Sequence, residues 1–200
     1  MTTTEDAEAS KNKAVPEGVI TELFLHPPGY DTPISVEQLK LEIDRGIQGD
    51  KHSGSRFSDI REKTLIQLGF RKGTHIANMR HITAISVEEL AEISRLMLSN
   101  PDLPAIHLEP NIVLEGIKGL SQLPAGTLLS FGEKRSAIFA VWDENSPCPT
   151  PHKNIKAAFP DATGAFASVA RHRRGVVGFV YCGGPIKVGD PVYVHPRAAR

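Results

Sequence analysis

The 200-residue sequence has the size of one large domain or two small ones, and 40% hydrophobic residues are enough for a sizeable core. Its 23 basic and 23 acidic side chains cancel, so no net charge indicates a nucleic acid or a membrane surface as partner. No apolar stretch approaches the roughly 20 residues that a membrane-spanning helix needs. Two cysteines do not make a disulfide framework, and we therefore expect a cytoplasmic protein with reduced thiols.

The N-terminal part of the chain combines a polar segment with two expected strands. Residues 1–17 lack the apolar core of a signal peptide, and we expect a short disordered tail there. Residues 19–25 are predicted to form a strand that ends at the proline- and glycine-containing turn 26–29. A period-two alternation of apolar and charged residues over 39–43 indicates a second, half-buried strand.

Helical signals are few. The sequence from Ser86 to Glu89 is a capping box, in which the Ser86 hydroxyl accepts from the Glu89 amide and the Glu89 carboxylate reaches back. Apolar residues at helical spacing follow it. A second helix is predicted over residues 163–173, ended by Gly175, and a short one over residues 152–159.

Most of the remaining chain consists of short apolar runs separated by glycine, proline and asparagine. Seven or eight short strands with two or three helices predict a mainly β fold, a closed or nearly closed β-barrel, in a single domain over residues 18–196. The strands are too closely spaced for alternating βαβ units. Besides those given above, the predicted strands are residues 63–68, 111–115, 127–131, 136–142, 176–181 and 191–195.

Cys148 lies in the segment 145–152, just after the most apolar run of the chain, residues 137–142. The prolines on both sides of Cys148 fix φ and cannot donate backbone hydrogen bonds, so the loop is stiff. A cysteine in such a loop can act as a nucleophile or sulfur carrier, or as a metal ligand. From the residues alone, a buried structural cysteine explains the position equally well.

A zinc site is a further alternative. Cys148, His152, His172 and Cys182 provide four possible ligands. Their spacing does not match the common zinc patterns, which argues against this interpretation.

The glycine-rich segment 46–54 contains a candidate anion site at Gly49, Asp50, Lys51 and His52. Glycines let backbone amides approach an anionic ligand closely, and Lys51 and His52 would add positive charge. The alternative is an ordinary turn, because the same residue types are typical of turns.

Three other polar residues have both a structural and a functional interpretation. Arg61 can form a bidentate pair with a phosphate or with a protein carboxylate. Asn111 can tie two loops together or present its amide to a pocket. Arg174 ends the only dense basic run, residues 171–174, which either complements a helix dipole or clamps a planar anion.

Seven motifs in this chain follow one familiar order. They are Gly46–His52, Arg61–Ile66, Glu109–Gly116, Leu123–Thr127, Pro147–Cys148, Arg174–Val177 and Gly183–Asp190. Over about residues 18–195 they resemble the MOSC domain, the module named for the C-terminus of molybdenum cofactor sulfurases.

The resemblance implies a barrel like that of the pyruvate kinase barrel domain and a role in handling the molybdenum cofactor or its sulfur. It implies that Cys148 carries a persulfide or ligates molybdenum. The residues implied to bind the cofactor, a molybdopterin, are Gly49, Asp50, Lys51, His52, Arg61, Asn111 and Arg174.

The chain departs from the family pattern in two ways. Residues 149–152 read Pro-Thr-Pro-His, where the family often has a second cysteine or an arginine. The chain also lacks a pyridoxal-phosphate sulfurase domain, so pyridoxal phosphate would belong to a separate cysteine desulfurase partner.

Two other functional classes remain open. One is a molybdenum-dependent oxidoreductase that reduces N-hydroxylated compounds with the help of a reductase partner. The other is a non-catalytic delivery module that docks on a sulfurase or reductase.

Overall fold

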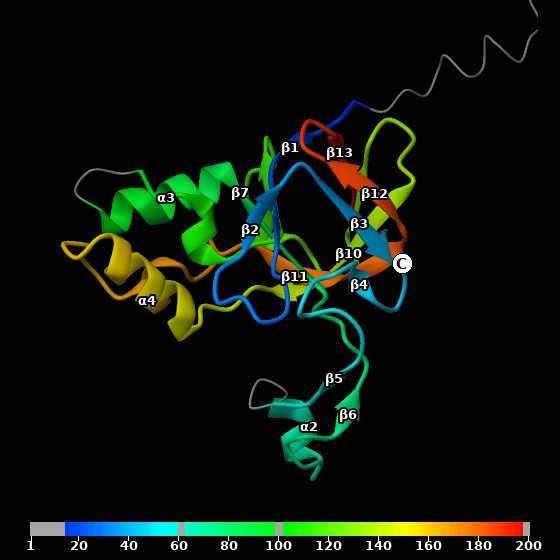
Figure 1. The fold of residues 1–200 in the computed structure, drawn as a ribbon, viewed down its shortest axis with the longest axis horizontal. Coiled ribbons are helices and arrows are strands. Elements are labelled where there is room, and N and C mark those ends of the chain that lie inside the picture. Colours follow the sequence, from blue (N-terminus) through cyan, green and yellow to red (C-terminus); the bar gives the residue numbers. More distant parts are fainter. Residues whose placement is uncertain (1–14, 60–62, 99–101, 198–200) are drawn as a thin grey trace, which may run out of the picture.

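A closed barrel of seven strands lies at the centre of the structure, a computed structural model that describes residues 15–59, 63–98 and 102–197 (Figure 1). Around the barrel the strand order is β13, β9, β10, β11, β7, β8 and β1, and β1 closes the ring by pairing Gly18 with Val192 of β13. The predicted closed barrel is therefore confirmed. The strands are β1 (Gly18–Leu25), β7 (Ile82–Ser86), β8 (Ile112–Glu115), β9 (Leu128–Phe131), β10 (Ala137–Glu144), β11 (Val176–Cys182) and β13 (Pro191–His195).

All neighbouring barrel strands are antiparallel except β7 and β8. Parallel strands need a crossover, and here α3 (Val87–Met97) and the 3-10 turn η2 (Ala105–Leu108) provide it. Outside the ring, β2 (Ile34–Val36) pairs with β1, and β12 (Gly184–Lys187), β3 (Gln38–Glu42) and β4 (Gly46–Ile47) form a second sheet. A further 3-10 turn, η3 (Leu120–Gln122), lies between β8 and β9.

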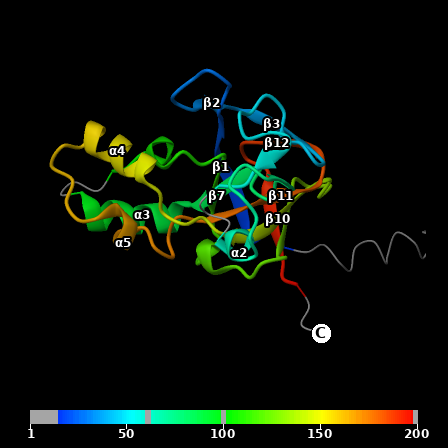
Figure 2. The same cartoon turned by 90° about the horizontal axis from the view of Figure 1, so that it is seen from below.

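Two apolar cores meet at the barrel wall. Because side chains alternate along a strand, Ile112 and Leu114 of β8 point into the barrel core, whereas Val113 joins the outer core. The outer core is covered by α3, α4 (Pro149–Ala158) and α5 (Phe166–Val169), which lie together on one side of the barrel (Figures 1 and 2). Strand β8 is thus apolar on both faces.

Helix α3 begins as the capping box predicts, but only half of the box forms. The Glu89 amide donates to the Ser86 hydroxyl at 3.2 Å. The Glu89 carboxylate instead accepts from the amide and the hydroxyl of Ser121, both at 2.8 Å. It therefore ties α3 to η3 rather than to its own N-terminus.

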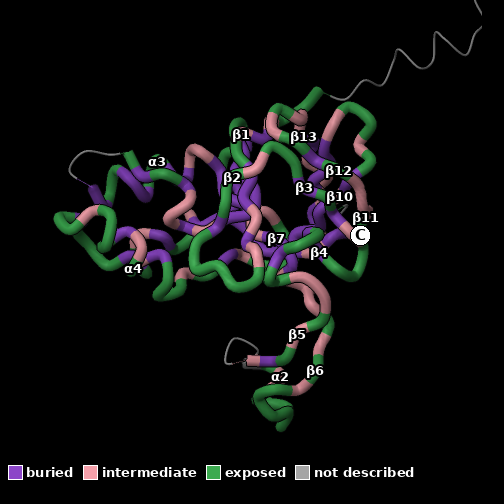
Figure 3. The backbone as a smooth tube through the Cα atoms, viewed as in Figure 1, coloured by how far each residue is buried: buried purple, intermediate pink, exposed green. Residues whose placement is uncertain are grey.

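A two-stranded arm projects from the barrel (Figure 1). It contains β5 (Arg56–Phe57), α2 (Lys63–Gln67) and β6 (His75–Ile76), and we call residues 56–76 the arm. Figure 3 shows that most of its backbone belongs to exposed residues. No helix in the described ranges has the length and apolar character needed to cross a membrane.

Two secondary-structure predictions were wrong. Residues 63–68 were expected to form a strand, but residues 63–67 form helix α2, which lies in the chain between the paired strands β5 and β6. The helix expected over 163–173 is only the four-residue α5, and His172 beyond it has a left-handed φ of 60°. The helix expected over 152–159 is confirmed as α4.

The predicted tail lies mostly outside the described residues, which begin at Val15. Within the described part, Glu17 already pairs with β13, because its amide donates to Val192 O at 2.9 Å and its carboxylate accepts from the Val194 amide. The paired region therefore starts one residue before the predicted boundary at residue 18.

Candidate functional site

Asp50 is a buried carboxylate at which three separate segments meet. Its Oδ2 accepts from the His26 amide and from Asn111 Nδ2, both at 3.0 Å. Its Oδ1 accepts from the amide and from Nδ1 of His52, both at 2.8 Å. The carboxylate thereby joins the end of β1, the loop after β4 and the residue that precedes β8.

The loop after β4 is shaped by local backbone chemistry. Gly49 adopts φ +81°, a conformation that glycine enters without steric cost. Asp50 then accepts from the amide two residues ahead, which is the usual Asx turn. The Lys51 amide donates to His26 O at 2.7 Å, so the loop is joined to the end of β1.

The electrostatic state of Asp50 follows from its partners. Burial raises the pKa of the Asp50 carboxyl, but hydrogen bonds from His52 and from the His26 amide outweigh burial and lower the pKa below its usual value. Asp50 is therefore an anion at neutral pH. Its oxygens are occupied by protein donors, so it positions its neighbours rather than offering free oxygens to a ligand.

His52 is oriented by this carboxylate. Because Oδ1 of Asp50 is acceptor-only, His52 Nδ1 must carry the proton, and the neutral ring then has its lone pair on Nε2. The His52 side chain is 49% exposed. The pair thus presents a fixed imidazole to solvent, which can accept a proton, bind a metal or, when protonated, donate to an anion.

His26 packs against His52 with ring centroids 5.3 Å apart and an edge-to-face arrangement. Its Nε2 lies 3.4 Å from Pro110 O, and its buried Nδ1 has no hydrogen-bond partner in the described part of the chain. Burial lowers the pKa of His26 more than the nearby Asp50 raises it, so this ring is neutral at neutral pH.

Asn111 uses its whole side chain within the protein. Its Oδ1 accepts from the amide and hydroxyl of Thr83, and its Nδ2 donates to Phe24 O and to Asp50. It therefore ties β1, β7 and the loop after β4 together. Of the two interpretations of Asn111, the geometry favours the structural one.

Cys148 is exposed and occupies the N-cap of α4. Its side chain makes no capping hydrogen bond, so the thiol is not used to stabilise the helix. Pro149 and Pro151 lack amide protons, which leaves the Thr150 amide as the possible donor among the first three helical residues. Lys156, one of the nearby cations in the sequence, instead donates to Ala162 O.

Arg174 holds the loop that leads to Cys148. Its guanidinium is buried and donates from Nη1 to Ser146 O at 2.7 Å and to Asn145 Oδ1 at 3.4 Å. Nη2 donates to Leu108 O at 3.5 Å. The two preceding basic residues are engaged separately, since Arg173 pairs with Glu92 and His172 Nδ1 contacts Glu144.

The Cys148 loop and the Asp50 cluster are connected through residues 108–111. Arg174 joins the loop to Leu108, and Asn154 of α4 donates to Glu109 Oε1 at 3.0 Å. Pro110 contacts His26, and Asn111 contacts Asp50. The fold thus links Cys148, Asp50, His52, Asn111 and Arg174, which are far apart in sequence, into one framework.

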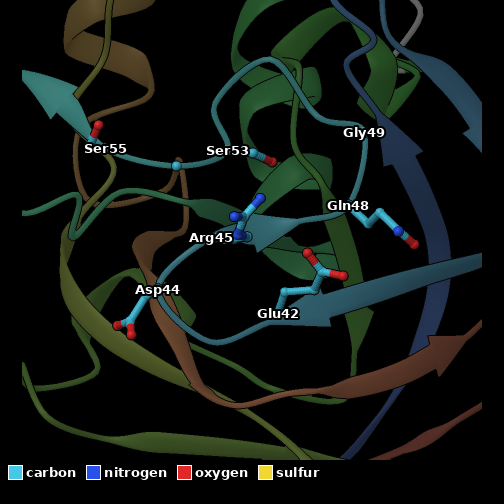
Figure 4. Close-up of a pocket in the computed structure, with 8 residues that line it drawn as sticks. Glu42, Asp44, Arg45, Gln48, Gly49, Ser53 and Ser55 are labelled. Atoms are coloured by element: carbon cyan, nitrogen blue, oxygen red, sulfur yellow. The ribbon is translucent and has the colours of Figure 1, made fainter.

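A cavity of about 600 Å³ lies on the loop after β4 (Figure 4). Among the described residues of the sequence-predicted set, Gly49 alone lines it. Figure 4 shows Glu42, Arg45 and Ser53 near its centre, with Asp44 turned away. Its lining residues are Glu42, Asp44, Arg45, Gln48, Gly49, Ser53, Gly54 and Ser55.

The remaining sequence-predicted residues are Lys51 and Arg61. Lys51 is exposed, and its ammonium makes no hydrogen bond or ion pair with the described residues, so it can contact an anion. Arg61 lies outside the described residues. Within the described ranges no group of three or more His, Cys, Asp or Glu side chains is placed to hold a metal ion, so the four residues of the zinc alternative do not converge there.

Two residues of the candidate site were not predicted from the sequence. His26 was interpreted only as part of a turn, although a histidine at the end of a buried strand is a detectable signal. Arg45 precedes the glycine-rich segment and lines the cavity, but one arginine beside Glu42 and Asp44 has no distinctive pattern.

The comparisons with known proteins give a consistent family assignment. The MOSC domain model matches residues 71–193. A Bacillus subtilis (strain 168) protein named as a putative metal-sulfur cluster biosynthesis protein, YuaD, is 32% identical over 161 residues, which cover 78% of this chain and 80% of YuaD. The chain belongs to the MOSC domain family.

Solved MOSC-family structures agree with the barrel. The crystal structure of Bacillus subtilis YuaD superimposes with a TM-score of 0.78 at 27% identity, covering 90% of this chain and 97% of YuaD. Escherichia coli YiiM gives a TM-score of 0.55 at 16% identity, covering 91% of this chain and 72% of YiiM, and shares the fold. Membership of the MOSC family associates the chain with molybdenum-cofactor and sulfur-related processes.

Proposed function

We propose that this MOSC domain handles sulfur or the molybdenum cofactor through the Cys148 thiolate, either as a persulfide carrier or as a molybdenum ligand. The observation that carries the proposal is an exposed thiol in a loop held by the buried Arg174 guanidinium. A structural cysteine would be expected to pack in the core. The name of YuaD, a putative metal-sulfur cluster biosynthesis protein, supports a sulfur-related role.

The geometry divides the predicted residues into two groups. Asp50, Asn111 and Arg174 have their polar atoms engaged with protein and form the framework. Cys148, Lys51 and His52 are exposed and keep groups that can meet a ligand. We infer that this second group makes the direct contacts.

The chemistry of each of these exposed groups suits a part of a molybdopterin. Thiolate sulfur is a soft ligand suited to molybdenum, and the ammonium of Lys51 and the imidazole of His52 suit a phosphate. The N-terminus of α4, at which Cys148 lies, also favours anions. When bound, the cofactor would supply redox chemistry at molybdenum, and the protein residues would bind and orient it.

In the carrier role the chemistry is thiol–persulfide exchange. The Cys148 thiolate attacks the terminal sulfur of a donor persulfide, R–S–SH, and a new S–S bond forms as the donor S–S bond breaks. The products are the Cys148 persulfide and the donor thiolate, R–S⁻. The exchange needs no further oxidant, and the donor would be a persulfide-bearing cysteine desulfurase.

The test is to measure cyanide-labile sulfur and molybdenum content in purified wild-type protein, Cys148→Ala and Cys182→Ala. The second cysteine is a matched control because it is half-buried at the end of β11. We expect a sulfur or molybdenum signal in wild type and Cys182→Ala and its loss in Cys148→Ala. Sulfane sulfur without metal indicates the carrier, and bound molybdenum indicates the ligand role.

A signal that survives in Cys148→Ala would refute the assignment. A molybdenum-dependent reductase would additionally turn over N-hydroxylated compounds with an electron donor. A delivery module would pass its sulfur or cofactor to an acceptor protein without turnover.

A further inference from the structure

The cavity on the loop after β4 contains an arginine that no described residue neutralises. The Arg45 guanidinium lines this cavity, and it forms no hydrogen bond or ion pair within the described ranges. In a second cavity, of about 520 Å³, the Arg173 guanidinium already pairs with Glu92. The guanidinium of the first cavity, unlike that of the second, is therefore available to a ligand.

The backbone that carries Arg45 is fixed on both sides. Residues 42–46 form the turn between β3 and β4, and in this turn the Arg45 amide donates to Glu42 O at 3.2 Å. The Arg45 carbonyl accepts from the Gly54 amide at 2.7 Å. Because the backbone is already ordered, a ligand has to order only the side chain, which lowers the entropic cost of binding.

Glu42 brings a carboxylate to the same cavity. The turn holds the Cα atoms of Glu42 and Arg45 within about 7 Å of each other, yet the two side chains form no ion pair. Glu42 lies 3.3 Å from Lys40 Nζ, but the Lys40 side chain is 57% exposed and such a surface pair is weak. Figure 4 shows Glu42 and Arg45 near the centre of the cavity. A ligand can therefore meet a cation and an anion at one place.

The balance of charge decides which class of ligand suits the cavity. The charged side chains of the turn and of β3 beside it carry two positive and two negative charges; they are Lys40, Glu42, Asp44 and Arg45. A phosphate dianion would be attracted by Arg45 but repelled by the carboxylates of Glu42 and Asp44. A zwitterion instead pairs each of its charges with an opposite one. The cavity thus favours a ligand that carries both signs of charge.

We propose that this cavity binds the zwitterionic head group of a free α-amino acid. The α-carboxylate lies on the Arg45 guanidinium, whose planar fork suits a carboxylate, and the α-ammonium lies on Glu42. The Ser55 hydroxyl and the Gly49 amide line or flank the cavity without an acceptor in the described part of the chain, so they are further donors for the carboxylate. A volume of about 600 Å³ leaves room for the amino-acid side chain. The proposal does not depend on the role of Cys148.

The test is isothermal titration calorimetry of the full chain with each standard L-amino acid and with inorganic phosphate. At least one amino acid is expected to bind, and phosphate is expected to bind more weakly than that amino acid. The N-acetyl derivative of the tightest binder lacks the ammonium, and its carboxamide lacks the carboxylate. Each derivative should bind about 10- to 100-fold more weakly, which is the effect of losing one charged hydrogen-bonding partner.

Variants then assign each charge to its partner. Arg45→Gln and Glu42→Gln should each weaken binding of the amino acid about 10- to 100-fold. Arg45→Gln should also remove the preference for the amino acid over its carboxamide, and Glu42→Gln the preference over its N-acetyl derivative, because each contact is then missing on both sides. Arg95→Gln and Glu133→Gln are the controls, since both residues are exposed and neither lines the cavity.

Several results would overturn the proposal. They are a wild type that binds none of the amino acids, derivatives that bind as tightly as the amino acid, and an Arg45→Gln protein that binds like wild type. Phosphate that binds more tightly than every amino acid would indicate an anion site instead. The derivatives are tested on wild type, so this part of the test is independent of how the variants fold, and circular dichroism checks the fold of each variant.

Discussion

Replacing Asp50 by alanine is the most direct test of the framework under the candidate site. The change removes the acceptor of two buried donors, the His26 amide and Asn111 Nδ2. A buried donor without a partner costs about 1–3 kcal/mol, so the expected loss of unfolding free energy is about 2–6 kcal/mol. The His52 donors are partly exposed, and water can replace their partner.

Asp50→Asn tests the orientation of the His52 ring separately from the stability of the fold. An asparagine whose oxygen faces His26 and Asn111 keeps both buried hydrogen bonds, and its NH₂ group then faces His52. The His52 ring must shift its proton to Nε2 to accept at Nδ1, and the lost bond to the His52 amide costs about 1 kcal/mol. This variant should stay folded but lose any function that requires a lone pair on Nε2 of His52.

The assay is urea unfolding of wild type, Asp50→Ala and Asp50→Asn between about pH 3 and 7. Because folding lowers the pKa of Asp50, its stabilisation is present above the unfolded value of about 3.9 and is lost as pH falls through the folded pKa. Asp44→Asn is the control, since Asp44 is exposed. An Asp50→Ala protein within about 1 kcal/mol of wild type would refute the reasoning.

Three further predictions concern the same fold. Arg174→Ala should lower the unfolding free energy by about 2–4 kcal/mol and speed hydrogen exchange over residues 145–148, whereas exposed Arg171→Ala should do neither. Burial lowers the pKa of His26 in the folded protein, so the unfolded chain takes up this proton at a higher pH than the folded one does. The free energy of unfolding therefore falls as pH drops below about 6.5. His26→Gln should flatten this slope between about pH 7 and 5, which urea unfolding measures. Gly178→Ala would place a Cβ 1.9 Å from Ala140 O and should cost about 3 kcal/mol or more, whereas Gly29→Ala, with open space but φ +83°, should cost about 1–2 kcal/mol by thermal unfolding.

Several features of this protein could be predicted from local sequence. Short apolar runs bounded by glycine, proline or asparagine predicted the strands of the barrel, and period-two alternation predicted β3 in the second sheet. The capping box predicted the start of α3, because Ser86 and Glu89 lie within one turn of each other. Cys148 was recognisable because its proline-flanked loop follows the most apolar run.

Features that depend on distant segments could not be predicted. Leu65 and Ile66 have the composition of a strand, yet residues 63–67 form a helix between β5 and β6 rather than a strand of their sheet. Glu89 was expected to cap its own helix, but Ser121 lies within reach in the fold and takes its carboxylate.

The candidate site shows the same division. The sequence alone indicated possible ligand contacts at Gly49–His52, Asn111 and Arg174, because their residue types suit an anionic ligand. Only tertiary structure shows that the Asp50 and Asn111 side chains are saturated with protein hydrogen bonds, while Lys51, His52 and Cys148 remain exposed. The reason is physical, because a hydrogen bond depends on distance and direction between groups that residue order does not bring together.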